Sequence, residues 1–215
     1  RASVEFTSLD VPFGMNRCEI RIDATDSFPA DDHYLFAVER ADPRRILFIH
    51  EPRDTRSAMY FRTALEASAE PVFALDAVPT PEAGSVTLSK YSFVVFSNVA
   101  SIPANFEDEL RRYVRGGGSL LVALGPSTAT RGKVPVVDMP VTGSSYASGR
   151  GERFQTAEWL DSGHPSVRRA NRWDGVRFYQ LTRIDAADAR VVARTSDRTP
   201  VLFEKNVGAG RVLVF

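Results

Sequence analysis

A short amphipathic helix, three glycines and an apolar strand follow one another in the segment FEDELRRYVRGGGSLLVALG, and they constrain the fold most. Leu110, Tyr113 and Val114 have the i, i+3, i+4 spacing of one helical face, with the charges opposite. Gly116–Gly118 predict the end of that helix, because glycine adopts the left-handed C-cap conformation without a steric penalty. The apolar run Leu120–Leu124 is typical of a strand buried on both faces. The segment therefore predicts half of a βαβ unit.

Composition excludes several classes of function. The 27 basic and 27 acidic residues balance, so no global charge favours nucleic acid or anionic lipid. The single cysteine, Cys18, excludes an internal disulfide and any cysteine-based metal site. No apolar run approaches the roughly 20 residues that span a bilayer. Both ends of the sequence read as cut, which predicts a soluble segment of a longer protein, with any membrane contact made by segments outside this chain.

Residues 1–42 predict a β-rich arm, or the end of an immunoglobulin-like region. Ser3–Leu9, Arg17–Ile22 and Tyr34–Glu39 are its candidate strands. An acidic cluster lies between the last two, comprising Asp23, Asp26, Asp31 and Asp32. Calcium prefers such carboxylate oxygens, but the spacing of a calcium loop is missing, so the turn interpretation is favoured over a metal site.

Residues 43–215 predict an α/β domain with a parallel sheet. Strands are expected at Ile46–Ile49, Val72–Leu75 and Phe93–Ser97, with a helix over Ser57–Ser68 between the first two. Ser57 is the expected N-cap of that helix.

The last third of the chain predicts a loop and then mostly strands. Residues 126–153 are rich in Gly, Ser, Thr and Pro, with a possible edge strand at Val134–Asp138. Phe154–Leu160 has a helical appearance, and Asn206–Gly210 predicts a hairpin turn at the edge of the sheet. Strands are expected at Val176–Leu181, Arg190–Arg194, Pro200–Lys205 and Arg211–Phe215.

Polar residues follow the predicted parallel strands, where α/β sheets bind ligands. These candidate ligand-binding residues are His50, Glu51, Arg53, Asp54, Ser97, Asn98, Ser127 and Thr128. A histidine, a carboxylate and a serine can form a hydrolytic triad, but no G-x-S-x-G motif is present. Solvated loop polarity is the favoured interpretation.

Further residues are weaker candidates for a site. His164 is included as a candidate ligand-binding residue, although a histidine next to a proline in a turn is usually structural. Tyr146, Arg150, Arg131 and Lys133 can line a pocket, but charged loop residues are usually just solvated. With His33, the chain has three scattered histidines, which argues against a zinc site, and no metal or cofactor is predicted.

Three phrases carry a resemblance to a known family: RRILFIHEPRD, YSFVVFSNVASIP before the glycine-bearing helix, and PVLFEKNVGAGRVLVF. The chain resembles the class I glutamine amidotransferase-like superfamily, in particular the domain of BatA-like membrane-anchored bacterial proteins. The resemblance implies a flavodoxin-like three-layer sandwich over residues 43–215. It also implies an extracytoplasmic location.

The resemblance fails at the residues that carry out catalysis. Active members place a cysteine after the strand that matches Leu120–Leu124, where this chain has LGPST. Without a thiolate, glutaminase chemistry has no nucleophile. The expectation is a non-catalytic domain that binds an unknown protein partner or small ligand. The alternative is a hydrolase or carbohydrate-active enzyme that uses the same edge of the sheet.

Overall fold

A computed structural model of the 215-residue chain describes residues 3–6, 9–23, 27, 32–67, 73–146, 154–168 and 173–215. The chain divides into two compact units, Arg1–Pro43 and Arg44–Phe215. The division lies one residue from the position at which the sequence pattern changes.

The first unit contains an antiparallel hairpin. Strand β1, Gly14–Arg21, pairs with β2, His33–Arg40, in a register that places Cys18 opposite Phe36. The strand expected at Ser3–Leu9 is not formed by its described residues, which have no regular structure. Apolar alternation alone does not make a strand, because a strand also needs a partner for its backbone hydrogen bonds.

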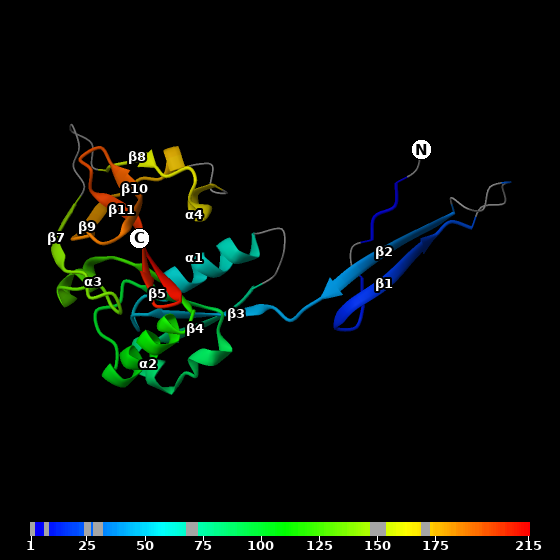
Figure 1. Ribbon diagram of the computed structural model, residues 1–215, viewed down its shortest axis with the longest axis horizontal. Helices are drawn as coiled ribbons and strands as arrows, with labels where there is room; N and C mark the ends of the chain where they lie inside the picture. Colours follow the sequence, from blue (N-terminus) through cyan, green and yellow to red (C-terminus); the bar gives the residue numbers. More distant parts are fainter. Residues whose placement is uncertain are drawn as a thin grey trace. The chain divides into compact units, whose positions relative to one another are not determined.

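The second unit is built on an eight-stranded sheet in the order β4-β3-β5-β6-β12-β11-β10-β8 (Figure 1). The first five strands in this order are parallel, and the last three continue the sheet in antiparallel fashion. The parallel strands are β3 Arg44–His50, β4 Phe73–Pro79, β5 Phe93–Ser97, β6 Ser119–Ala123 and β12 Gly210–Val214. The others are β8 Ala157–Leu160, β10 Arg190–Thr195 and β11 Pro200–Val207.

Alternate side chains of the parallel strands support helices on opposite faces of the sheet (Figure 1). Ile46 and Phe48 of β3 pack with α1, Thr55–Glu66. Leu47 and Ile49 pack in the cluster that contains α2, Ala104–Arg115. This period-two alternation explains why the segment Ile46–Ile49 of the strand is apolar without interruption. The predicted mixed α/β class with a largely parallel sheet is confirmed.

Helix α2 and the glycines after it have the predicted structure. Phe106, Leu110 and Val114 are buried on one face, and Gly116 is the C-cap. The end of the helix also packs tightly against β12. A Cβ built on Gly210 would lie 2.1 Å from the Val114 carbonyl oxygen, so this strand can approach the helix only with a glycine there.

Several predicted elements of the last third are wrong. The helix expected at Phe154–Leu160 is replaced by β8, which pairs with β10. Val134–Asp138 forms a turn with tight backbone hydrogen bonds instead of a strand. The β11–β12 hairpin lies inside the sheet and not at its edge, because β10 and β8 extend the sheet beyond it. Strand pairing with distant segments therefore overrides the local pattern at β8 and at the edge of the sheet, whereas local hydrogen bonds determine the turn at Val134–Asp138.

The remaining elements are short. A separate two-stranded sheet joins β7, Val141–Tyr146, to β9, Gln180–Ile184. Strand β9 begins four residues later and ends three residues later than the predicted strand Val176–Leu181. The short helices are α3 Pro126–Arg131 and α4 Pro165–Arg168, and 3-10 helices occur at Thr80–Ser85, Leu88–Lys90 and Trp173–Gly175. Within the described residues, no helix has the length and apolar character needed to cross a bilayer.

Candidate functional site

The loops after β3, β5 and β6 meet at the carboxyl end of the parallel strands. The strand order reverses here, since β4 and β5 lie on opposite sides of β3. Such a switch point is where open α/β sheets bind ligands. In the register of the sheet, His50 is opposite Ser97, and Ser97 is opposite Ala123. The predicted polar residues of the three loops are therefore neighbours. The remaining candidate, His164, is in none of these loops and lies elsewhere.

The loop after β3 uses its polar groups to hold its own shape. His50 is buried, and its Nδ1 donates to the Glu51 carbonyl oxygen at 2.8 Å. The Glu51 carboxylate accepts a 2.8 Å hydrogen bond from the backbone N–H of Ala100, in the loop after β5. Asp54 is the N-cap of α1, in place of the predicted Ser57, whose backbone N–H it accepts at 3.2 Å. Arg53 is exposed and makes no side-chain hydrogen bond within the described residues.

Asn98 connects the loop after β5 to the start of α3. Its Oδ1 accepts the backbone N–H groups of Ser127 at 2.8 Å and Thr128 at 3.2 Å, and its φ of 50° is one that asparagine tolerates. The hydroxyl of Thr128 is buried without a partner in the described part of the chain. Ser97 is buried as well. The predicted residues at this end thus act mainly as loop supports.

In the LGPST segment after β6, Gly125 leaves no room for a side chain. A Cβ built there would lie 2.5 Å from Asn98 Oδ1 and 3.0 Å from Asn98 Cβ. The Gly125 φ of −171° is ordinary extended backbone, so the restriction comes from crowding alone. A side chain at this position would displace the amide that caps α3.

A small cavity of about 200 Å³ opens beside this position, and its described lining has no ionisable side chain. Leu124, Gly125 and Pro126 form one wall, and Phe203 and Phe215 lie among the others. Gln180 and Thr182 supply the only polar side chains of this described lining. The described lining of this cavity is largely apolar and supplies no acidic, basic or thiol side chain.

His164 lies at the opposite, amino end of the parallel strands. Its ring is buried, with Nδ1 2.6 Å from Ser166 Oγ and Nε2 3.3 Å from Glu204 Oε2. The backbone N–H of Ser166 also donates to Nδ1, at 3.3 Å. Nδ1 is therefore the acceptor, and the Nε2 proton is directed to Glu204. This is the one predicted site histidine that contacts both a hydroxyl and a carboxylate.

Neither partner of His164 is predicted by the sequence. Ser166 follows two residues later within a turn, and Glu204 is 40 residues away. One signal did point to Glu204, which ends the apolar run of β11 after three buried residues, Val201–Phe203. A carboxylate at that place needs a partner, since burying an unpaired charge is costly.

His164, Ser166 and Glu204 line a larger cavity of about 440 Å³. Its walls are mostly apolar, and its remaining lining residues are Arg44, Ile46, Phe61, Leu65, Phe73, Ser92, Phe93, Ser119, Leu120, Pro165, Arg211 and Leu213. We call this cavity the amino-end groove.

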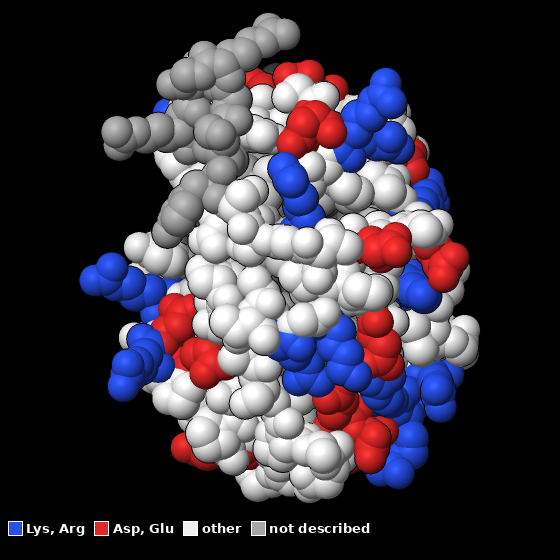
Figure 2. Space-filling model, turned by 90° about the vertical axis from the view of Figure 1, so that its left-hand side faces the viewer, with Lys and Arg blue, Asp and Glu red and all other residues white. Residues whose placement is uncertain are grey.

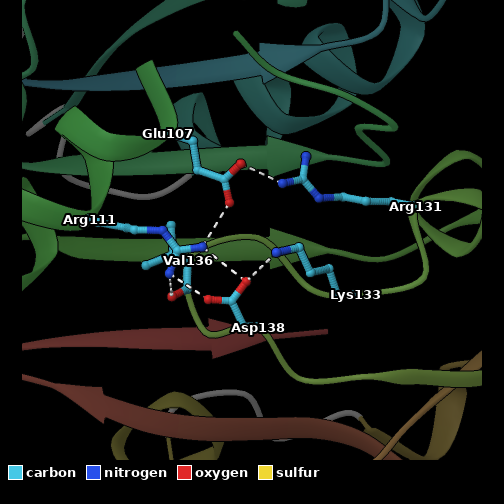
Figure 3. Close-up of polar contacts among 6 residues, drawn as sticks. All are labelled: Glu107, Arg111, Arg131, Lys133, Val136 and Asp138. Carbon is cyan, nitrogen blue, oxygen red and sulfur yellow. Dashed lines mark hydrogen bonds and ion pairs between the residues drawn. The ribbon is translucent and has the colours of Figure 1, made fainter. Parts of the chain in front are cut away.

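Arg131 and Lys133 belong to an ion-pair network and are not simply solvated loop residues (Figure 3). Arg131 pairs with Glu107, which also binds Arg111 at 3.0 Å, and Arg111 makes a two-bond contact with Asp138 at 2.6 and 3.0 Å. The hydrogen bond from Arg111 is the largest influence on Asp138 and, with Lys133, lowers its pKa to about 2 against the opposing effect of burial. The network connects the 133–140 loop to α2 through ion pairs.

The other charged side chains of the described residues do not form a cluster of one sign on the face drawn in Figure 2. On the face drawn in Figure 2, acidic and basic side chains are interspersed. No group of three or more potential metal ligands occurs in the parts of the chain that the structure describes. Asp26, Asp31, Arg150 and the side chain of Tyr146 lie outside the described residues.

No protein-family model and no curated protein matches this sequence. Solved structures with a similar fold include Gan42B, a GH42 β-galactosidase from G. stearothermophilus, at 12% identity and a TM-score of 0.53 over 81% of this chain. A ThuA-like protein from Bacteroides uniformis is similar at 10% identity and a TM-score of 0.54, covering 83% of this chain and 84% of that one. The chain spans only 27% of the galactosidase. At these identities the likeness concerns the fold, which is a mixed α/β fold related to that of the ThuA-like protein.

Proposed function

We propose that the Arg44–Phe215 unit is a non-catalytic binding module of the glutamine amidotransferase-like type. The parallel strand order β4-β3-β5-β6, with helices on both faces, supports a flavodoxin-like three-layer sandwich. The occupant is a protein partner or a small ligand. We extend the proposal to a membrane-anchored bacterial parent protein with this unit on its extracytoplasmic side, on the resemblance of the sequence alone.

The observation that carries the proposal is the uncharged cavity beside Gly125. Acyl transfer needs a nucleophile and a base within hydrogen-bonding reach. The described lining of that cavity contains neither, and Asn98 occupies the space a side chain at 125 would need. The absence of a thiol, an acid or a base from this described lining supports a module without acyl-transfer chemistry.

A role as one part of a larger protein agrees with the structural neighbours. In the β-galactosidase, a fold like this one accounts for about a quarter of the chain. The same kind of unit can thus be combined with other segments in a longer protein.

The alternative is a hydrolase or carbohydrate-active enzyme that uses the carboxyl end of the sheet. The galactosidase neighbours favour it only weakly, since the likeness is one of fold. Within the described residues, no hydrogen bond joins His50 to Ser127 or Thr128. His50 instead donates to a backbone carbonyl, which leaves its Nδ1 unable to act as a base.

The test is a substrate panel applied to the whole 215-residue chain. Ammonia release from L-glutamine and nitrophenol release from a nitrophenyl β-galactoside are measured for wild type, His50→Ala and the exposed-histidine control His33→Ala. We expect all three proteins to remain at the buffer background. Turnover by wild type that His50→Ala abolishes and His33→Ala preserves would overturn the proposal.

A further inference from the structure

The amino-end groove crosses the α1 face of the sheet. The register aligns Ile46, Phe93, Ser119 and Arg211 across β3, β5, β6 and β12, and all four line the cavity. Neighbouring strands are about 4.8 Å apart, so this row extends over about 14 Å. Residues of α1 border the groove toward β3 and β4, and the His164–Ser166 turn borders it toward β11.

The two parts of the groove differ in chemistry. Toward β3 and β4, the rings of Phe61, Phe73 and Phe93 and the side chain of Leu65 make an apolar surface, with Arg44 exposed at its rim. Toward β11, the lining changes to His164, Ser166, Glu204 and Arg211. An apolar body and a polar end are the general features of a small-molecule site, and 440 Å³ is within the usual size range of about 300 to 1,000 Å³.

The polar end has an acceptor that the described part of the protein does not use. Glu204 Oε2 receives the His164 bond and has Arg211 Nη1 3.7 Å away, while no hydrogen bond to Oε1 occurs among the described residues. The Glu204 side chain is only 13% exposed. A carboxylate oxygen so placed is best satisfied by a donor group, and Arg211 nearby balances its charge.

His164 is positioned to orient this carboxylate and not to activate Ser166. Both the hydroxyl and the backbone N–H of Ser166 point to Nδ1, as side-chain capping of a turn does. The Nε2 proton then fixes Glu204 with one oxygen bound and the other available.

We propose that the amino-end groove binds an uncharged amphiphile, with an alkyl or aryl body between α1 and β5 and a hydroxyl head that donates to Glu204. This assignment rests on the proposed function, because it names the ligand class of a module that binds without catalysis. It places the ligand at the opposite end of the strands from the position of the amidotransferase nucleophile.

The experiment is calorimetric titration of the 215-residue chain with 1-octanol and with 1-methoxyheptane, which has the same chain length but no hydroxyl proton. We expect the alcohol to bind at least about tenfold more tightly, since a hydrogen bond to a charged group is lost in the ether. Glu204→Gln should reduce this preference for the alcohol. Ser119→Trp should fill the groove and weaken both probes at least tenfold, whereas the exposed strand variant Ser145→Trp should bind as wild type does.

Equal binding of alcohol and ether, or alcohol binding unchanged by Ser119→Trp, would overturn the inference. Lack of binding with no turnover in the substrate panel would overturn the inference and leave the proposed function standing. A fluorophosphonate probe distinguishes the remaining case. Covalent labelling of Ser166, abolished in Ser166→Ala, together with hydrolysis of nitrophenyl butyrate, would show a hydrolase and would overturn both.

Discussion

The two ends of the parallel strands each hold a buried histidine, but in different surroundings. At the carboxyl end, His50 donates to a backbone carbonyl, and the polar side chains around it support loops. At the amino end, His164 connects a hydroxyl to a carboxylate at the border of a cavity. The difference shows that the usual position of a binding site in a fold does not determine where a particular chain has polar side chains that border a cavity.

The largest expected effect is the difference in stability between the alanine variants of the two histidines. His164→Ala removes the three hydrogen bonds of the ring and leaves Glu204 nearly buried without its donor, which we expect to cost about 3 kcal/mol. His50→Ala loses one bond to a backbone oxygen and should cost about 1 kcal/mol. Urea unfolding of both variants measures the difference. A larger loss of stability in His50→Ala than in His164→Ala would contradict this expectation.

The next effect tests the crowding at the carboxyl end. Gly125→Ala forces a methyl group against Asn98 and should cost about 2 kcal/mol. In an Asn98→Ala background the same change should cost clearly less, because the two residues are coupled. Gly143→Ala is the matched control, since a Cβ there meets nothing within 4 Å. Equal costs for Gly125→Ala in both backgrounds would show that Asn98 does not close this position.

A smaller effect comes from the ion-pair network, which lies at neither of the two sites. The pKa of Asp138 is lowered to about 2 from 3.8, so its stabilisation is complete above about pH 4 and is lost as pH falls toward 2. Because the side chain is 45% exposed, we expect about 1 kcal/mol. Asp138→Asn should lower stability by this amount at pH 7 and flatten the acid dependence, without changing 1-octanol binding. If the stability of Asp138→Asn depended on pH as that of wild type does, Asp138 would not contribute to the stabilisation by the network.

The smallest effect separates backbone strain from side-chain bonding. Arg198 is exposed with a φ of 64°, so Arg198→Gly should stabilise by about 0.5 kcal/mol. Asn98 has a similar φ of 50° but caps α3, so Asn98→Gly should destabilise despite the relief of strain. Thermal unfolding of the two variants gives the signs. Stabilisation by Asn98→Gly would mean that its hydrogen bonds matter less than its backbone.

Local sequence patterns predicted the parallel half of the fold well. Helix α2 and strand β6 have the periodicity and glycine ending that specify them without reference to distant residues. Strand β8 was mistaken for a helix, because only its pairing with β10 determines its conformation. Sequence reasoning is weakest where long-range pairing decides the structure.

The candidate site shows the same limit. The residues expected at the carboxyl end do lie together, since parallel strands bring their ends to one edge. Their spacing in the sequence does not show that hydrogen bonds to backbone groups use their polar atoms. The contact between His164 and Glu204 could not be predicted from the sequence, because it depends on the approach of a turn to β11, 40 residues away.

The most direct test of where this module binds is a map of backbone amide chemical shifts as 1-octanol is added to the 215-residue chain. The account predicts that the changes cluster at Ser119, Glu204 and Arg211, with Gly125 and Ser127 unaffected. Changes concentrated at Leu124–Thr128 would contradict it and would place the binding site at the carboxyl end of the sheet.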